Sequence, residues 1–234
     1  MCRDLFIAAA LALAALPAAA QSQPAVRVED TIAQRAAACT ACHGKEGRAT
    51  PDGYFPRIAG KPQGYLYNQL VNFREGRRRY PMMTYMVAHL SDAYLNELAA
   101  YYASLHPPYP APAPVKVSAQ VLERGRALVL NGDPSRNIPA CVACHGQQLT
   151  GVNPAIPGLL GLPRDYLNAQ FGAWKTGTRK AAAPDCMAQI AARLTSEEIS
   201  AASAWLASQP LAADMRPAAA PTTKLPLPCG TVTP

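Results

Sequence analysis

The stretch Cys39-Thr40-Ala41-Cys42-His43 returns later in the chain as Cys141-Val142-Ala143-Cys144-His145. The pattern C-x-x-C-H is the attachment site of c-type haem. Two thiols three positions apart can each form a thioether with a vinyl group on one edge of the same haem, and the His that follows becomes the proximal iron ligand. The two copies predict two covalent haem c groups. One would be held by Cys39, Cys42 and His43, and the other by Cys141, Cys144 and His145.

Two other sites also use C-x-x-C and have to be weighed against haem. A structural zinc site needs about four ligands at short range, and beyond the motifs the sequence adds only His89 and His106 in its first half and Cys186 near the second motif. A thioredoxin-like redox motif lies in a βαβ pattern, and no strand-rich run surrounds either copy. Haem attachment is therefore the interpretation that the sequence favours.

The sequence around the motifs is duplicated as well. The motifs align at an offset of 102 residues and the following segments at 101, which pairs several chemically matched positions: Pro56 with Pro157, Gly60 with Gly161, Tyr65 with Tyr166, Gln69 with Gln170, and Arg78 with Arg179. Further on, an offset of 104 pairs Met83 with Met187. Such an internal repeat indicates two homologous units.

We expect a first unit at 25–106, a Pro-rich linker at 107–114, a second unit at 115–209 and a Pro/Ala-rich tail at 210–234. Prolines at the density of the linker favour an extended spacer. The 234 residues are 50% hydrophobic but only 7% aromatic, so each unit alone would have a thin core. A covalent haem supplies a large apolar group around which a few helices can pack.

The expected elements are all helices. They lie at 29–38 and 118–130 before the motifs, at 65–74 and 166–175 in the middle of each unit, and after Ser91 and Thr195 at the end of each unit. Thr195-Ser196-Glu197-Glu198 has the form of a capping box, and Gly76 and Gly177 mark the ends of the middle helices. Because no run alternates between polar and apolar residues, we predict an all-α fold of two tandem domains.

Methionine is a common second axial ligand in cytochromes c and raises the reduction potential. The repeat selects Met83 and Met187, which we expect in matched, Pro-flanked loops. Met82 aligns with Cys186 instead, and Met86 aligns with Ile190, a packing position. For Met86 the simpler interpretation is an adaptable core side chain.

Cys186 and Cys229 are the cysteines that remain once the motifs and the first twenty residues are set aside. An oxidising compartment favours a disulfide between them. Two alternatives stay open: a Cys186 thiolate in place of Met187 on the iron, and thiols that are free or paired between molecules.

Residues 1–20 have the form of a secretory signal peptide, with an apolar run from Leu5 to Leu16 and small residues before Gln21. The run is too short to span a bilayer, so we expect export to the periplasm. An uncleaved signal, which would leave the chain associated with the membrane surface, is the alternative.

The formal net charge is +7, and two propionates on each of two haems would bring it to about +3. That balance argues against nucleic acid as a partner. The basic residues Arg74, Arg77, Arg78 and Arg79 form a cluster. The cluster either docks an acidic redox partner or is a solvated turn with arginines near the propionates, and the second interpretation is slightly favoured. His89 and His106 are expected on the surface.

Three segments resemble the dihaem class I cytochromes of the cytochrome c4 type: Pro56-Arg57-Ile58-Ala59-Gly60, Tyr65-Leu66-Tyr67-Asn68-Gln69-Leu70, and Met83-Thr84-Tyr85-Met86-Val87-Ala88-His89-Leu90-Ser91. The resemblance covers about 25–209 and implies His/Met iron pairs, here His43 with Met83 and His145 with Met187. Two features depart from that family, namely the Cys186 and Cys229 pair and the long proline-rich tail.

The resemblance implies a periplasmic electron carrier between a quinol-oxidising complex and a terminal oxidase. Similar dihaem chains are electron-accepting subunits of periplasmic dehydrogenases, which is the alternative function. A dihaem peroxidase-type enzyme is a weaker rival, because an enzyme needs a displaceable iron ligand and acid–base residues beside it.

Overall fold

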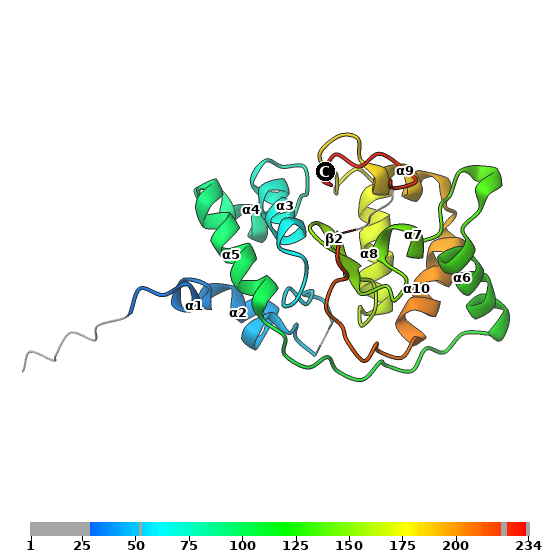
Figure 1. Cartoon of the computed structure of the whole chain (residues 1–234), viewed down its shortest axis with the longest axis horizontal. Coiled ribbons are helices and arrows are strands. Elements are labelled where there is room, and N and C mark those ends of the chain that lie inside the picture. The colour runs from blue at the N-terminus through cyan, green and yellow to red at the C-terminus, as the bar shows by residue number, and fades with distance from the viewer. Residues whose placement is uncertain (1–28, 52, 221–223, 233–234) are drawn as a thin grey trace, which may run out of the picture.

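The computed structural model describes residues 29–51, 53–220 and 224–232. The expected signal peptide at 1–20 and the expected start of the first unit at 25 lie outside these residues. The described chain forms two helical units side by side, and a long connection passes beneath both of them (Figure 1). No helix in the described ranges is both long enough and apolar enough to cross a membrane.

The first unit contains five α-helices and one short 3-10 helix. These are α1 (Ile32–Arg35), α2 (Ala37–His43), η1 (Lys45–Gly47), α3 (Gln63–Arg74), α4 (Pro81–Val87) and α5 (Asp92–Ser104). Helix α3 packs against both α4 and α5. Two groups of buried side chains hold these helices together: Ala36, Leu66, Leu98, Ala99 and Tyr102 in one, and Phe73, Val87 and Leu95 in the other.

The second unit has a similar order of α-helices, but its 3-10 helix precedes the motif helix instead of following it, and a small hairpin is added. Its elements are α6 (Ala119–Asn131), η2 (Pro134–Arg136), α7 (Val142–His145), β1 (Gly151–Val152), β2 (Ile156–Pro157), α8 (Arg164–Lys175), α9 (Cys186–Arg193) and α10 (Ser196–Ser208). Helices α6 and α10 make the most extensive contact. The main core gathers Val129, Leu149, Leu160, Leu162, Leu167, Ala202 and Leu206.

The helix caps that the sequence predicts are present. The hydroxyls of Ser91 and Ser118 accept hydrogen bonds from the first turns of α5 and α6, and Thr195 and Glu198 form a complete capping box at α10. Gly76 and Gly177 follow the middle helices with the same positive φ of 72°, a conformation that glycine adopts without steric cost.

Three local predictions differ from the structure. The segment 29–38 is not one helix, because the chain breaks at Ala36, where the Tyr102 hydroxyl donates to the Ala36 carbonyl at 2.9 Å. Met83 and Met187 lie in the first turns of the short helices α4 and α9 rather than in loops. The second unit also contains a small antiparallel hairpin, β1 with β2, whose two-residue strands are too short for an alternating pattern to reveal.

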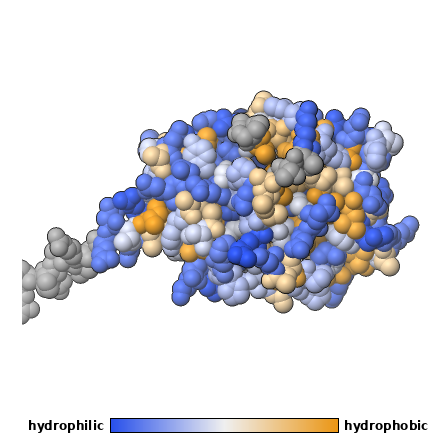
Figure 2. Space-filling model, in the orientation of Figure 1, coloured by the Kyte–Doolittle hydropathy of each residue, from blue (hydrophilic) through white to orange (hydrophobic). Residues whose placement is uncertain are grey.

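The tail returns across the second unit and then to the boundary between the units (Figure 1). Ala218 adds a parallel bridge to Val152, because its N–H donates to Gly151 and its carbonyl accepts from Asn153, both at 2.9 Å. Cys229 then forms a disulfide with Cys186 at the start of α9. The side chains on the face in Figure 2 are mostly hydrophilic, and the apolar ones lie in separate small groups.

The two units also share backbone hydrogen bonds. Arg79 N–H donates to the Thr178 carbonyl at 2.8 Å, and Lys180 N–H donates to the Arg77 carbonyl at 2.7 Å. At the start of α3, Gly64 N–H donates to the Pro154 carbonyl at 3.0 Å. A Cβ at position 64 would lie 2.8 Å from that carbonyl oxygen, so glycine permits this close approach.

Candidate haem sites

The two motif histidines are held in the same way. His43 and His145 end α2 and α7, and each residue is only 8% exposed. His43 Nδ1 lies 2.8 Å from the Pro56 carbonyl oxygen, and His145 Nδ1 lies 2.7 Å from that of Pro157. Because a carbonyl only accepts, Nδ1 carries the proton in both rings and Nε2 keeps a free lone pair. This tautomer and this bond to a carbonyl are typical of metal-ligating histidines.

Both imidazoles also favour the neutral form that an iron ligand requires. Burial lowers the pKa of His43, the hydrogen bond to Pro56 partly opposes this, and the charge of Arg78 lowers it further. For His145 the causes are burial, the opposing bond to Pro157, and the charge of Lys61. Neither Arg78 nor Lys61 was expected from the sequence to act on these rings.

The four motif thiols are unpaired and half-buried. Burial raises the pKa of Cys39, of Cys144 and, to about 12, of Cys141, so these thiols are protonated at neutral pH. Each unit thus offers two reduced thiols, one immediately before the oriented imidazole in the sequence and one about a helical turn earlier. This donor set fits haem c, with two thioether positions and one nitrogen ligand per site.

The methionines differ in their surroundings. Met83 is half-buried and packs against the Phe73, Val87 and Leu95 cluster, whereas its neighbours Met82 and Met86 are 55% and 38% exposed. Met187 directly follows the disulfide-bonded Cys186 at the start of α9. The disulfide confirms the predicted pairing, and it removes the alternative in which a Cys186 thiolate replaces Met187.

The chain is similar to known proteins. A family model described as cytochrome c matches residues 31–106. The chain is 42% identical to the "Thiosulfate dehydrogenase electron acceptor" of Thiomonas intermedia, over 75% of this chain and 80% of that protein. It is 33% identical to the "Cytochrome c4" of Pseudomonas aeruginosa, over 74% of this chain and 84% of that one. The chain belongs to the cytochrome c4 family. As a member, it is a c-type cytochrome that binds haem covalently and carries electrons.

The fold of this cytochrome is similar to that of a solved structure. The thiosulfate dehydrogenase (TsdBA) of Marichromatium purpuratum is similar with a TM-score of 0.67 and 37% identity, over 78% of this chain. The match spans only 40% of the TsdBA chain. The helical class I cytochrome c architecture predicted from the sequence is therefore confirmed.

In this cytochrome the basic cluster is mostly engaged within the molecule. Arg74 pairs with Asp92 at 2.6 Å and donates to the Leu90 carbonyl at 2.9 Å. Arg77 is bound to Glu75 and to Asn72, and Arg79 is the exposed member. Arg74, Arg77 and Arg78 are thus held by partners within the protein, and only Arg79 is exposed. This arrangement does not resemble a single docking patch. His89 and His106 are exposed, as expected.

Arg78 meets its repeat counterpart at the boundary between the two cytochrome units. Arg78 donates to Gln69 at 2.9 Å and to Gln170 at 2.8 Å. Arg179 donates to Gln170 at 2.7 Å and to Gln69 at 3.2 Å, and also to the Tyr65 hydroxyl at 3.3 Å. Each arginine therefore binds both glutamines. The repeat aligned these residues in sequence, but it gave no indication that they face one another.

Proposed function

We propose that this chain is a periplasmic dihaem cytochrome that transfers electrons one at a time through two iron centres. Cys39 and Cys42 would hold the first haem and Cys141 and Cys144 the second. The axial ligands would be His43 with Met83, and His145 with Met187. The haem supplies the Fe(II)/Fe(III) couple, while the protein sets its potential through the Met ligand and burial. We propose the domain limits 25–106 and 115–209 for the two units.

The observation that carries this proposal is the matched pair of imidazole–carbonyl hydrogen bonds, to Pro56 and to Pro157. A single such bond could orient any buried histidine. Two of them, at repeated positions and each beside two reduced thiols, support one haem in each unit rather than one in total.

The first prediction is the haem count. Pyridine haemochrome analysis of the mature protein should give two haem c per chain, because each unit has a complete attachment motif. A Cys141→Ser/Cys144→Ser variant should keep one haem, and so should Cys39→Ser/Cys42→Ser. A wild-type value of one, from a strain that fully matures other c-type cytochromes, would contradict the proposal.

We further propose that the electron donor is a dehydrogenase of the thiosulfate-oxidising kind. The support is the 42% identity to a protein named as the electron acceptor of thiosulfate dehydrogenase. The alternative, suggested by the cytochrome c4 relatives, is a respiratory carrier that accepts electrons from a quinol-oxidising complex. Stopped-flow reduction by each purified donor separates the two. Fast reduction by thiosulfate dehydrogenase plus thiosulfate supports our assignment, and fast reduction by the quinol-oxidising complex alone would overturn it.

The second prediction concerns the disulfide beside Met187. The bond closes a loop of 42 intervening residues and is worth on the order of 3–4 kcal/mol on the chain-entropy model. It also ties the tail to the residue that precedes Met187, and we expect this restraint to limit the access of water to that ligand. Reduction, or Cys229→Ser, should therefore ease displacement of Met187 by added imidazole and leave the first haem unaffected. Equal responses of both haems, measured in the visible spectrum, would contradict this.

A further inference from the structure

Each motif histidine is oriented by one proline carbonyl, but the two units hold these prolines by different means. In the second unit, Pro157 lies in strand β2 and pairs with Gly151 of β1. In the first unit the corresponding loop is irregular, and none of its described residues, 44–51 and 53–62, lies in a strand. The Pro56 carbonyl is therefore held in another way.

The backbone hydrogen bonds that the two loops share act further along the chain. The N–H groups of Ile58 and Ala59 both donate to the Gly47 carbonyl, at 2.9 and 3.0 Å. The matching residues of the second unit, 159–160, donate in the same way to one carbonyl of their own unit. Because these bonds are alike in both units, the difference between the loops lies at Arg57, the residue directly after the proline.

The side chain of Arg57 is held by the linker between the units. Arg57 is 5% exposed, and its guanidinium donates to the carbonyl of Pro108 at 3.2 Å and to that of Pro107. Its Nε also donates to the Ala59 carbonyl at 3.2 Å. The same guanidinium lies over the ring of Tyr109, 3.7 Å from the ring centroid, which is a favourable cation–π distance. Two segments far apart in the sequence thus meet at this one arginine.

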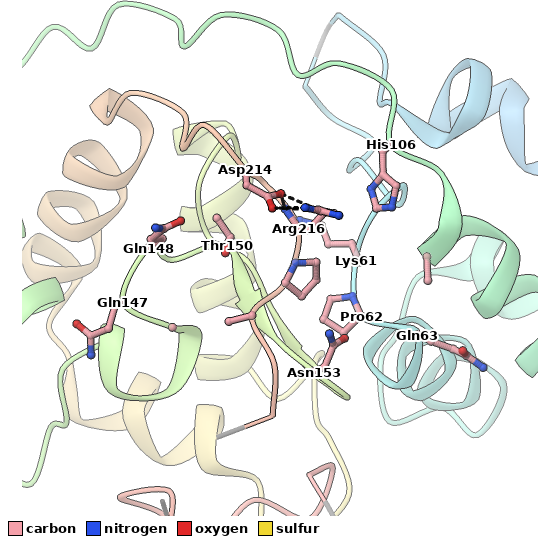
Figure 3. Close-up of a pocket in the computed structure, with 14 residues that line it drawn as sticks. Lys61, Pro62, Gln63, His106, Gln147, Gln148, Thr150, Asn153, Asp214 and Arg216 are labelled. Atoms are coloured by element: carbon pink, nitrogen blue, oxygen red, sulfur yellow. Dashed lines mark hydrogen bonds and ion pairs between the residues drawn. The ribbon is translucent and has the colours of Figure 1, made fainter. Parts of the chain in front are cut away.

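The ring of Tyr109 also contacts the second unit. A Cβ at Gly161 would lie 2.6 Å from the Cδ1 atom of Tyr109, so the ring packs directly on the backbone there. On another side, residues 211–216 of the tail line a cavity together with Arg57 and Tyr109. Figure 3 shows part of this tail segment beside His106, the residue just before the linker. The start of the linker is therefore packed between the two units and the tail.

We propose that Arg57 is a positioning residue for the first haem. Because the linker holds its side chain, the peptide that joins it to Pro56 is fixed, and the Pro56 carbonyl stays in place for the His43 ring. This role rests on the proposed ligation of iron by His43. In the second unit the hairpin has the same role, and the repeat has Gly158 in place of the arginine.

A fixed carbonyl affects the iron through the imidazole. The hydrogen bond from Nδ1 of His43 to the Pro56 carbonyl raises the basicity of the ring, so Nε2 becomes a stronger donor to the metal. A stronger donor stabilises Fe(III) relative to Fe(II) and lowers the reduction potential. Loosening the carbonyl should therefore raise the potential of the first haem and let the Nδ1 proton exchange faster with solvent. The second haem should not respond, because its hairpin does not involve Arg57.

The experiment is NMR of the fully reduced, isotope-labelled holoprotein, which follows the exchange of the Nδ1 protons of His43 and His145 in deuterated water. Arg57→Met should speed the exchange at His43 about tenfold or more, as expected when hydrogen bonds from a charged group are lost, and leave His145 unchanged. Arg57→Lys keeps the charge and should give an intermediate rate. Arg48→Met is the control, because Arg48 is an exposed arginine of the same loop, and both rates should stay at the wild-type value.

Two linker variants test the same role without changing any charge. Tyr109→Leu removes the ring beneath the guanidinium, so it should speed the exchange at His43 and raise the potential of the first haem alone. Tyr109→Phe keeps the ring and should match the wild type in both measurements. If Arg57→Met does not fold, the comparison of these two linker variants still decides the question.

Two results would overturn the role of Arg57 and leave the proposed ligation intact. One is an unchanged exchange rate at His43 in the Arg57 and Tyr109 variants, and the other is equal acceleration at His43 and His145, which would indicate a general loosening of the protein. A different result separates the proposed function from this role. If the wild type showed no haem-shifted Nδ1 signal from His43, the proposed ligation would be wrong, and the role of Arg57 would be overturned with it.

Discussion

Replacing Met187 by Ala is expected to lower the reduction potential of one haem by on the order of 0.1 V or more, within the roughly 0.8 V range that axial ligands span. Methionine sulfur favours Fe(II), and its loss admits water or another hard ligand. The weak long-wavelength absorption band of ferric Met–haem should fall by about half in intensity, since one of two equivalent sites is lost. Met83→Ala should do the same for the other haem.

Met86→Ala is the control for this prediction. Met86 lies three residues beyond Met83 on the same helix but is 38% exposed, so its replacement should change neither the band nor either potential. If Met86→Ala removed the band and Met83→Ala did not, the assignment from the internal repeat would be wrong. Spectroelectrochemistry of the three variants decides between these outcomes.

Glu198→Gln is expected to destabilise the second unit by about 2–3 kcal/mol. Glu198 is 5% exposed and accepts hydrogen bonds from Arg136 at 2.7 Å, from Arg124 at 3.2 Å and from Thr195 N–H at 2.9 Å. It joins the start of α10 to η2, the short helix before the second haem motif. Arg136 would stay paired with Asp133 at 2.6 Å, so the expected loss comes from the hydrogen bonds between charged groups that the nearly buried Glu198 carboxylate accepts.

The pH dependence follows from the same contacts. The hydrogen bonds from Arg136, more than any other cause, hold the pKa of Glu198 at about 2, below its usual 4.5. A carboxyl with a lowered folded-state pKa contributes stability that is fully present above pH 4.5 and is lost as the pH falls toward 2. The lowering corresponds to about 3 kcal/mol at neutral pH. The free energy of unfolding of wild type, measured in guanidinium, should therefore fall by this amount between pH 4.5 and 2. That of Glu198→Gln should not.

Glu197→Gln is the matched control, because Glu197 is the preceding residue and is exposed. Its replacement should leave the free energy of unfolding at pH 7 nearly unchanged, as is usual for exposed charges. Equal destabilisation by the two variants would show that helix α10 responds to charge at its N-terminus in general, and not to the Glu198 network.

The parts of this cytochrome that the sequence predicted are those with a local signature. The C-x-x-C-H motifs, the caps at Ser91 and Thr195, and the glycines that end α3 and α8 each depend on a few neighbouring residues. The disulfide was predictable for a different reason: only Cys186 and Cys229 remained to pair. The class I fold followed from the motifs and the resemblance that they carry.

The parts that the sequence did not predict depend on contacts between distant segments. The break at Ala36 involves a hydroxyl on α5, and the strand-like contact of Ala218 needs the tail to return to Val152. Met83 lies in a helix because Pro81 is favourable in a first turn, whereas the flanking prolines had suggested a loop. Lys61 carries no motif at all, and its effect on the pKa of His145 arises only in the folded chain.

The reciprocal contact of Arg78 and Arg179 with Gln69 and Gln170 has a consequence for the history of the chain. Each arginine binds the glutamine of its own unit and that of the other, which is the pattern of an isologous interface in a twofold homodimer. A single ancestral unit with one arginine and one glutamine at these positions could make this contact with a copy of itself. Fusion of two such genes would then have kept a dimer interface that already existed, and joined its halves on one chain.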